Sequence, residues 1–167
     1  MKIRNEYDLV CCRKPLVIPE GWDFTPCVND KLIVVCSQGH FLAGDSMAKL
    51  DALQSATWLM ALVGTLARQH FEEMMTRLQW PQVRRFHIIS REMIIIMSIM
   101  KQAKLLALLP RSIITPWLEN SFFAELNTCI HIPLDDIGFL NKRKDYSDST
   151  NLLTNYMLDM FSCSVSC

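Results

Sequence analysis

The chain has 167 residues, of which 50% are hydrophobic and 20% are charged. This balance is typical of a folded domain with a buried core and excludes a disordered chain. The formal net charge is zero, which argues against a domain that binds nucleic acid by itself, because contacts to phosphates need a basic surface.

The seven cysteines include no Cys-x-x-Cys pair. An odd number without paired spacing favours reduced thiols over a disulfide framework. No apolar run follows the basic residues at the N-terminus, and the longest apolar stretch, residues 93–100, is too short to span a bilayer. We therefore expect a soluble, cytoplasmic protein that has no membrane partner.

Short apolar runs and one periodic segment define the expected elements of the first half of the chain. The runs predict strands over residues 7–12, 31–36 and 57–63, and Gly64 ends the last of them. After Gly64 an apolar residue recurs every three or four positions, which predicts an amphipathic helix from about Thr65 to Gln79.

The second half continues the alternation of strands and helices. We expect strands over 83–89, 104–109 and 137–141, and helices over 91–102 and 111–118, the second irregular because of Pro116. Ser90 is the expected N-cap of helix 91–102, which is apolar almost all round and must be covered on more than one side. A last helix, capped by Ser149 or Thr150, should turn six residues inward: Leu152, Leu153, Tyr156, Met157, Met160 and Phe161. The alternation predicts an α/β fold with a mostly parallel sheet.

No segment carries a recognisable catalytic motif. His-Glu-x-x-His, Gly-x-Ser-x-Gly, the phosphate loop and Gly-x-Gly-x-x-Gly are all missing, and the four histidines are far apart in the sequence. The acidic doublets Glu72-Glu73 and Asp135-Asp136 are typical of solvated surface charge. We therefore expect no enzyme, no catalytic residue, no metal site and no cofactor.

Five segments follow one another in an order that points to a family. They are Tyr7–Cys12, Asp30–Cys36 with Gly39–Ala43, Gly64-Thr65 with Arg68 and Phe71-Glu72, Leu106–Ser112, and Ile137–Leu140 with Arg143 and Ser147. In this order and spacing, from about Tyr7 to Phe161, the chain resembles the C-terminal effector-binding (substrate-binding) domain of LysR-type bacterial transcription regulators.

The resemblance implies a two-lobed α/β fold of the type II periplasmic-binding-protein kind. The first lobe would comprise residues 1–55 plus 132–167, and the second lobe residues 56–131. The family's winged helix-turn-helix has no counterpart in this sequence. The first strand, first helix and second strand of the family's effector domain also have no counterpart here, so we expect an incomplete first lobe. That gap also accounts for the lack of helices in the first fifty residues, since a parallel sheet needs cover on both faces.

The implied function is the sensing of a small anionic metabolite in the cleft between the lobes. DNA would be bound only through the helix-turn-helix domain that this chain lacks. Three alternatives stay open: a solute-binding protein of the same fold, a small α/β enzyme and a non-functional truncated remnant.

The expected effector site centres on Thr65 and Ser90, each at the start of a helix that follows a strand. Free N–H groups and the positive end of the helix dipole suit an anion there, and Gly64 would let the backbone approach it. The alternative is that both hydroxyls are plain N-caps. Self-association is expected through strand 83–89 and helix 91–102, with Ile95 and Ile96 at the interface. The alternative is that this helix is core on all sides.

Overall fold

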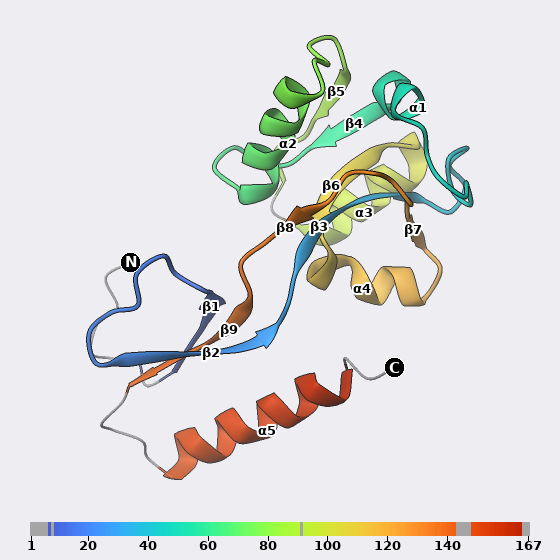
Figure 1. Ribbon diagram of the computed structural model, residues 1–167. Coiled ribbons are helices and arrows are strands. Elements are labelled where there is room, and N and C mark those ends of the chain that lie inside the picture. The colour runs from blue at the N-terminus through green and yellow to red at the C-terminus, as the bar shows by residue number, and fades with distance from the viewer. Residues whose placement is uncertain (1–6, 8, 91, 143–147, 165–167) are drawn as a thin grey trace. The chain divides into compact units, whose positions relative to one another are not determined.

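Two compact units make up the chain in a computed structural model that describes residues 7, 9–90, 92–142 and 148–164 (Figure 1). Unit 1 comprises Met1–Asp30 and Leu134–Cys167, and unit 2 comprises Lys31–Pro133. The division differs from the lobes expected from the sequence, because residues 31–55 and 132–133 belong with the second unit.

Unit 2 is built on a six-stranded sheet in the order β5-β4-β6-β3-β7, with β8 also paired to β3. The parallel pairs are β4 with β5 and β4 with β6, whereas β3 runs antiparallel to β6, β7 and β8. The sheet is therefore mixed, and the expectation of a mostly parallel sheet is wrong. The bounds are β3 (Lys31–Ser37), β4 (Thr57–Met60), β5 (Arg84–His87), β6 (Leu106–Pro110), β7 (Phe123–Glu125) and β8 (Ile132–Pro133).

The continuous apolar run of β3 explains why the sequence predicted this strand and why it predicted the wrong strand direction. Every residue of β3 after Lys31 is buried, so the strand is covered on both of its faces. Burial on both faces removes the apolar–polar alternation that usually marks an antiparallel strand. The apolar run therefore predicts the strand but carries no information about its direction.

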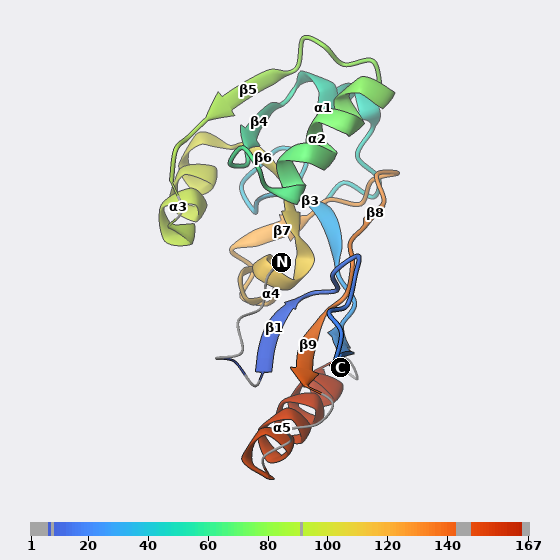
Figure 2. The ribbon, with the colours of Figure 1, turned by 90° about the vertical axis from the view of Figure 1, so that its left-hand side faces the viewer.

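Helices cover both faces of this sheet, as Figure 2 shows for α3 on one side and α2 on the other. On the first face α3 (Met93–Ala103) and α4 (Arg111–Glu119) pack against alternate strand residues. On the opposite face α2 (Leu66–Arg77) places Phe71 against Trp58, with ring centroids 5.3 Å apart. Trp58 also donates a hydrogen bond of 2.9 Å to the Leu53 carbonyl in α1 (Leu50–Ser55). The core of the first face is Ile33, Val35, Leu59, Met97, Met100, Leu105, Ala107, Ile114 and Phe123.

The two expected helix starts have different outcomes. Thr65 is the N-cap of α2, and its side chain accepts a hydrogen bond from the Arg68 N–H, so this prediction is confirmed. Ser90 is not the N-cap of α3, because the helix begins later and Glu92 occupies that position. The Ser90 hydroxyl instead accepts a hydrogen bond of 3.1 Å from the N–H of Glu92, the N-cap residue itself.

Unit 1 holds a three-stranded antiparallel sheet in the order β1-β9-β2. Its strands are β1 (Leu9–Arg13), β9 (Ile137–Lys142) and β2 (Trp22–Val28). The sequence did not predict β2, because Asp23, Thr25 and Pro26 interrupt its apolar pattern.

The final helix, α5 (Asp148–Ser164), packs on unit 1 through Phe161, whose ring centroid lies 6.4 Å from that of Phe139. Thr154 is also buried. The expected inward face is wrong for four of its six residues, which are exposed: Leu152, Leu153, Tyr156 and Met160. Both faces of α5 carry apolar residues, so periodicity alone could not decide which face meets the sheet.

Candidate functional site

The carboxyl ends of three neighbouring strands form the candidate site of unit 2. Strands β5, β4 and β6 run parallel, and the register pairs Met60 with His87 at the ends of β4 and β5. A helix follows each strand: α2 after β4, α3 after β5 and α4 after β6. The carboxyl edge of parallel strands is where open α/β sheets usually bind ligands.

Gly64 and Thr65 lie at this edge, between β4 and α2. Gly64 has φ +86°, which an L-residue rarely adopts, and the space around its Cα is open. The Thr65 hydroxyl donates to the Leu62 carbonyl at 2.7 Å and accepts from the Arg68 N–H at 3.3 Å. The Thr65 hydroxyl therefore caps α2. It keeps one lone pair that could accept a further hydrogen bond, but its proton is already donated to the Leu62 carbonyl.

Ser90 lies at the same edge of the sheet. It follows the end of β5 at His87, just as Thr65 follows the end of β4 at Met60, and these two strand ends are paired. Its side chain is half-buried, and its oxygen accepts from the Glu92 N–H. The hydroxyl proton of Ser90 can therefore be donated outward, unlike that of Thr65. The topology brings the two expected site residues to one edge of the sheet, although no hydrogen bond joins them.

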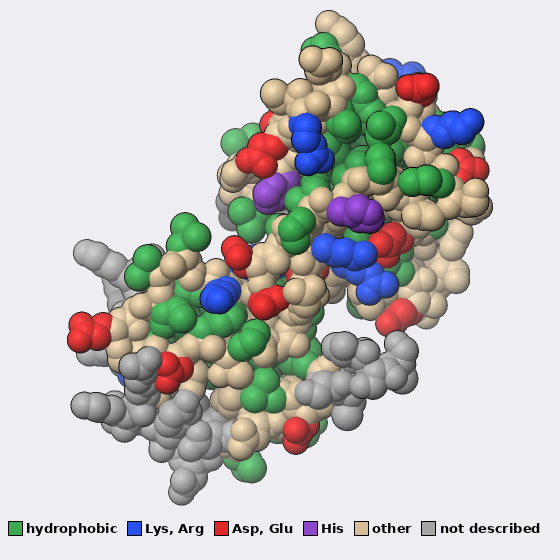
Figure 3. Space-filling model, in the orientation of Figure 1, with side chains coloured by type: hydrophobic (Ala, Val, Ile, Leu, Met, Phe, Trp, Pro, Cys, Tyr) green, Lys and Arg blue, Asp and Glu red, His purple; other side chains and the backbone are tan. Residues whose placement is uncertain are grey.

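The charged group after the third strand is already paired. Arg111 begins α4, and its Nε lies 3.1 Å from Oε2 of Glu125. The other carboxylate oxygen of Glu125 lies 3.5 Å from the Lys31 ammonium. On the face drawn in Figure 3, acidic and basic side chains are interspersed with hydrophobic ones, so no extended basic surface appears there.

The thiols and the buried histidine do not suggest catalysis. Burial raises the pKa of the Cys36 thiol to about 11, and burial together with the neighbouring Cys11 raises the pKa of Cys12 and of Cys27. A raised pKa keeps a thiol protonated and weakens it as a nucleophile. Burial also lowers the pKa of His40, whose Nδ1 accepts from the Leu42 N–H at 3.1 Å. Within the described residues, no three His, Cys, Asp or Glu side chains are placed to hold a metal ion.

The two expected interface residues face different environments. Ile95 is 45% exposed, whereas Ile96 packs against the core cluster of unit 2. Three further apolar side chains on β5, on α3 and between them are exposed: Phe86, Ile89 and Ile94. We call Phe86, Ile89, Ile94 and Ile95 the β5–α3 patch. Separately, no helix in the described part of the chain has both the length and the hydropathy needed to cross a membrane.

Residues 2–146 match the family model of the LysR substrate-binding domain. The chain belongs to this family. No curated protein matches the sequence significantly.

Solved structures of the LysR family share the fold. The regulatory domain of CcmR from Synechocystis PCC6803, solved in complex with 2-PG, has a TM-score of 0.67 and 19% identity over 94% of this chain and 74% of its own. NMB2055 (MetR), a LysR family regulator from N. meningitidis, has a TM-score of 0.61 and 15% identity over 94% and 71% of the two chains. The effector-binding domain of QuiR, solved with shikimate, has a TM-score of 0.59 and 14% identity over 94% and 73%.

These matches confirm two predictions from the sequence. The chain is a LysR substrate-binding domain, and it has the α/β, periplasmic-binding-protein-like type II fold. Effector-binding domains of this family belong to transcription regulators, and the QuiR and CcmR domains were solved with small ligands bound. The roles of Gly64, Thr65, Ser90, Ile95 and Ile96 stay predictions.

Proposed function

We propose that this chain is the ligand-sensing domain of a LysR-type transcription regulator that acts in the cytoplasm and has no enzymatic activity of its own. The observation that carries the proposal is the family match over residues 2–146. The effector is a small anionic metabolite, and DNA is bound only through a helix-turn-helix domain outside the substrate-binding domain.

The unit 2 part of the effector site comprises Gly64, Thr65 and Ser90. Support comes from the register of Met60 with His87, since it makes the starts of α2 and α3 emerge at one edge. Free N–H groups and the helix dipole favour an anion at such a position. The Ser90 hydroxyl adds a donor, and the open space at Gly64 lets a ligand approach the backbone.

A thermal-shift screen of paired ligands tests this function. Each carboxylate or phosphate is measured beside its neutral amide or alcohol, and we expect only the anionic member to raise the melting temperature. A ligand at 100 times its Kd stabilises the folded state by about 2.7 kcal/mol. A shift produced equally by the neutral analogues would show that the effector is not anionic.

Two alanine variants locate the site. We expect Thr65→Ala and Ser90→Ala each to weaken binding about tenfold, which corresponds to about 1.4 kcal/mol. Loss of the Thr65 cap alone lowers stability by about 1 kcal/mol, so melting without ligand is measured on each variant. Thr76→Ala is the matched control, because Thr76 is an exposed helical threonine at the other end of α2. If both site variants bind as tightly as the parent chain, the site lies elsewhere.

The β5–α3 patch is the proposed surface for self-association. Four apolar side chains close together in the sequence are exposed there, and exposed apolar patches usually mark interfaces. Ile95 contributes to this surface directly. Ile96, which packs on the core, contributes by holding α3 in place.

A further inference from the structure

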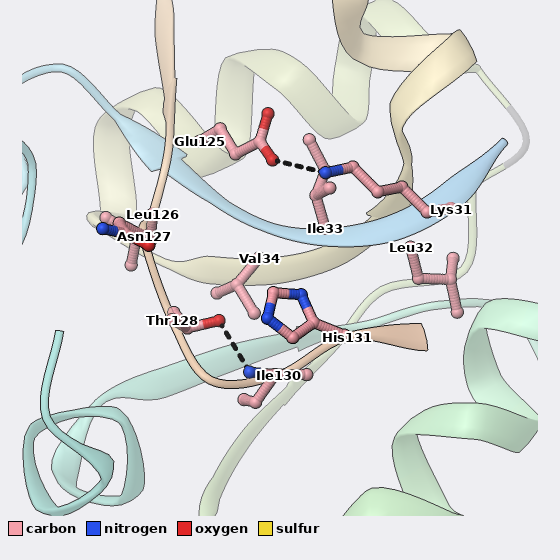
Figure 4. A pocket seen from close by; sticks show the side chains of 10 residues that line it. All are labelled: Lys31, Leu32, Ile33, Val34, Glu125, Leu126, Asn127, Thr128, Ile130 and His131. Atoms are coloured by element: carbon pink, nitrogen blue, oxygen red, sulfur yellow. Dashed lines mark hydrogen bonds and ion pairs between the residues drawn. The ribbon is translucent and has the colours of Figure 1, made fainter. Parts of the chain in front are cut away.

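A cavity lies in unit 2 beside the part of strand β3 between its pairings with β7 and with β8. Strand β7 pairs Glu125 with Val35, and strand β8 pairs Ile132 with Leu32. Two residues of β3 lie between these partners, whereas six residues of the other segment, 126–131, must fit the same span. The extra residues loop away from β3 and leave a cavity of about 380 Å³ between the loop and the strand (Figure 4).

A buried hydroxyl in this cavity has a proton to donate. Thr128 is only 6% exposed, and its Oγ1 accepts a hydrogen bond of 3.1 Å from the Ile130 N–H. Within the described residues nothing accepts the Thr128 hydroxyl proton. Figure 4 shows the hydroxyl on the cavity side of the loop, on the same side as the His131 ring. A buried donor without an acceptor is costly, so a bound group that accepts there is favoured.

A backbone donor faces the same space. The Val34 carbonyl accepts from the Leu126 N–H at 2.8 Å. In an antiparallel strand the N–H and C=O of one residue point to the same side, so the Val34 N–H is also directed to the gap. No residue of loop 126–131 accepts from it. Because buried backbone N–H groups almost always find an acceptor, this second donor points to the same conclusion.

The remaining walls decide the kind of ligand. Leu32 and Ile130 are buried apolar residues on the lining, and His131 adds a ring nitrogen. The only charged side chains on the lining, Lys31 and Glu125, neutralise each other in an ion pair. The cavity thus offers two or three donors beside an apolar wall, which matches the two oxygens and the hydrocarbon part of a short carboxylate.

We propose that this cavity is a second ligand site, and that it binds a short-chain monocarboxylate. The carboxylate accepts hydrogen bonds from the Thr128 hydroxyl and the Val34 N–H, and its alkyl part lies against Leu32 and Ile130. The site is separate from the carboxyl edge, because Gly64, Thr65 and Ser90 do not line the cavity.

Titration with butyrate, followed by amide chemical shifts in nuclear magnetic resonance spectra, tests the proposal. For so small a ligand we expect a Kd of about 1 mM, so the titration runs to about 20 mM. The amide signals of Val34, Thr128 and His131 should move with one binding curve, and those of Thr65 and Ser90 should not follow it. Butyramide, which has no charge, should bind at least tenfold more weakly.

Variants of Thr128 separate binding from folding. Thr128→Ser keeps the hydroxyl and should bind butyrate within about twofold of the parent chain. Thr128→Val removes the hydroxyl and should weaken binding about tenfold. Thr115→Val is the matched control, since Thr115 is a half-buried threonine of α4 that does not line the cavity.

The proposal is overturned if butyrate at about 20 mM leaves the Val34 and Thr128 signals in place, since that concentration is well above the expected Kd. Shifts confined to Thr65 and Ser90 would overturn it too, and would support the effector site instead. Equal binding by the Ser and Val variants would contradict the role of the hydroxyl. If Thr128→Val does not fold, the titration of the parent chain still decides.

Discussion

Arg13 and Asp30 form a salt bridge of 2.5 Å in unit 1, although the Asp30 side chain is only 1% exposed. The second terminal nitrogen of the Arg13 guanidinium, Nη1, donates to the Asp135 carbonyl at 2.9 Å. The Asp30 carbonyl accepts from the Leu134 N–H at 3.0 Å. One arginine thus connects the two chain segments that build unit 1. The Arg13 guanidinium offsets part of the cost of burying Asp30 as a carboxylate.

Replacing this arginine should therefore destabilise the protein strongly. We expect Arg13→Met to lower the free energy of unfolding by about 3 kcal/mol, the low end for a broken buried pair, because Arg13 is partly exposed. Urea unfolding at neutral pH measures the change. The control is Arg68→Met, which should cost less than about 1 kcal/mol because Glu72 keeps Arg85 as a partner. Equal losses in the two variants would contradict the importance of the buried pair.

Gly138 should tolerate no side chain at all. A Cβ there would lie 2.2 Å from the Thr25 carbonyl oxygen and 2.9 Å from the Pro26 Cα, and both are backbone atoms of the neighbouring strand. We expect Gly138→Ala to cost about 3 kcal/mol or more, because β2 and β9 would have to separate. Gly39→Ala is the control, since no atom lies within 4 Å of the added Cβ, and its melting temperature should stay close to that of the parent chain. A Gly138→Ala protein that melts like the control would show that the strands can move apart cheaply.

We expect the protonation of His40 to lower the free energy of unfolding in weak acid. Burial lowers its pKa, and the Leu42 N–H occupies Nδ1, so the folded protein favours the neutral ring. Below the unfolded-state pKa of about 6.5, His40 binds a proton in the unfolded chain but stays neutral in the folded one. The free energy of unfolding therefore falls as the pH falls, until the pH reaches the lower folded-state pKa.

The variant His40→Asn should flatten this part of the stability profile. Asparagine keeps an acceptor for the Leu42 N–H but does not titrate. Chemical unfolding at several pH values between about 5 and 7.5 brackets the ordinary histidine pKa. His87→Asn, which replaces an exposed histidine, serves as the comparison and should keep the slope. If the slope survives His40→Asn unchanged, another group causes it.

The two isoleucines of α3 should behave differently when charged. Ile95→Lys places a charge on the exposed β5–α3 patch, and we expect weaker self-association in sedimentation with a melting temperature close to that of the parent chain. Ile96→Lys buries part of a charge against the core cluster and should lower the free energy of unfolding by about 2 kcal/mol or more. If Ile95→Lys leaves the oligomer and the solubility unchanged, the patch is not an interface.

Periodicity and caps along the chain were enough for several elements. The spacing of apolar residues after Gly64 predicted α2, and Thr65 is its N-cap as expected, because a cap depends only on the next three residues. The apolar runs of β3 and β4 likewise predicted strands. The order of short motifs also predicted the family, which the match over residues 2–146 confirms.

Relations between distant residues had to come from the tertiary structure. The direction of β3 depends on its pairing with β6 and β7, residues far away in the sequence. Whether Ile95 or Ile96 is exposed depends on how α3 rotates against the sheet, and an all-apolar helix carries no polar face to set that rotation. The cavity between Val34 and Thr128 exists because loop 126–131 is longer than the strand it spans, a mismatch that appears only once β7 and β8 are paired with β3.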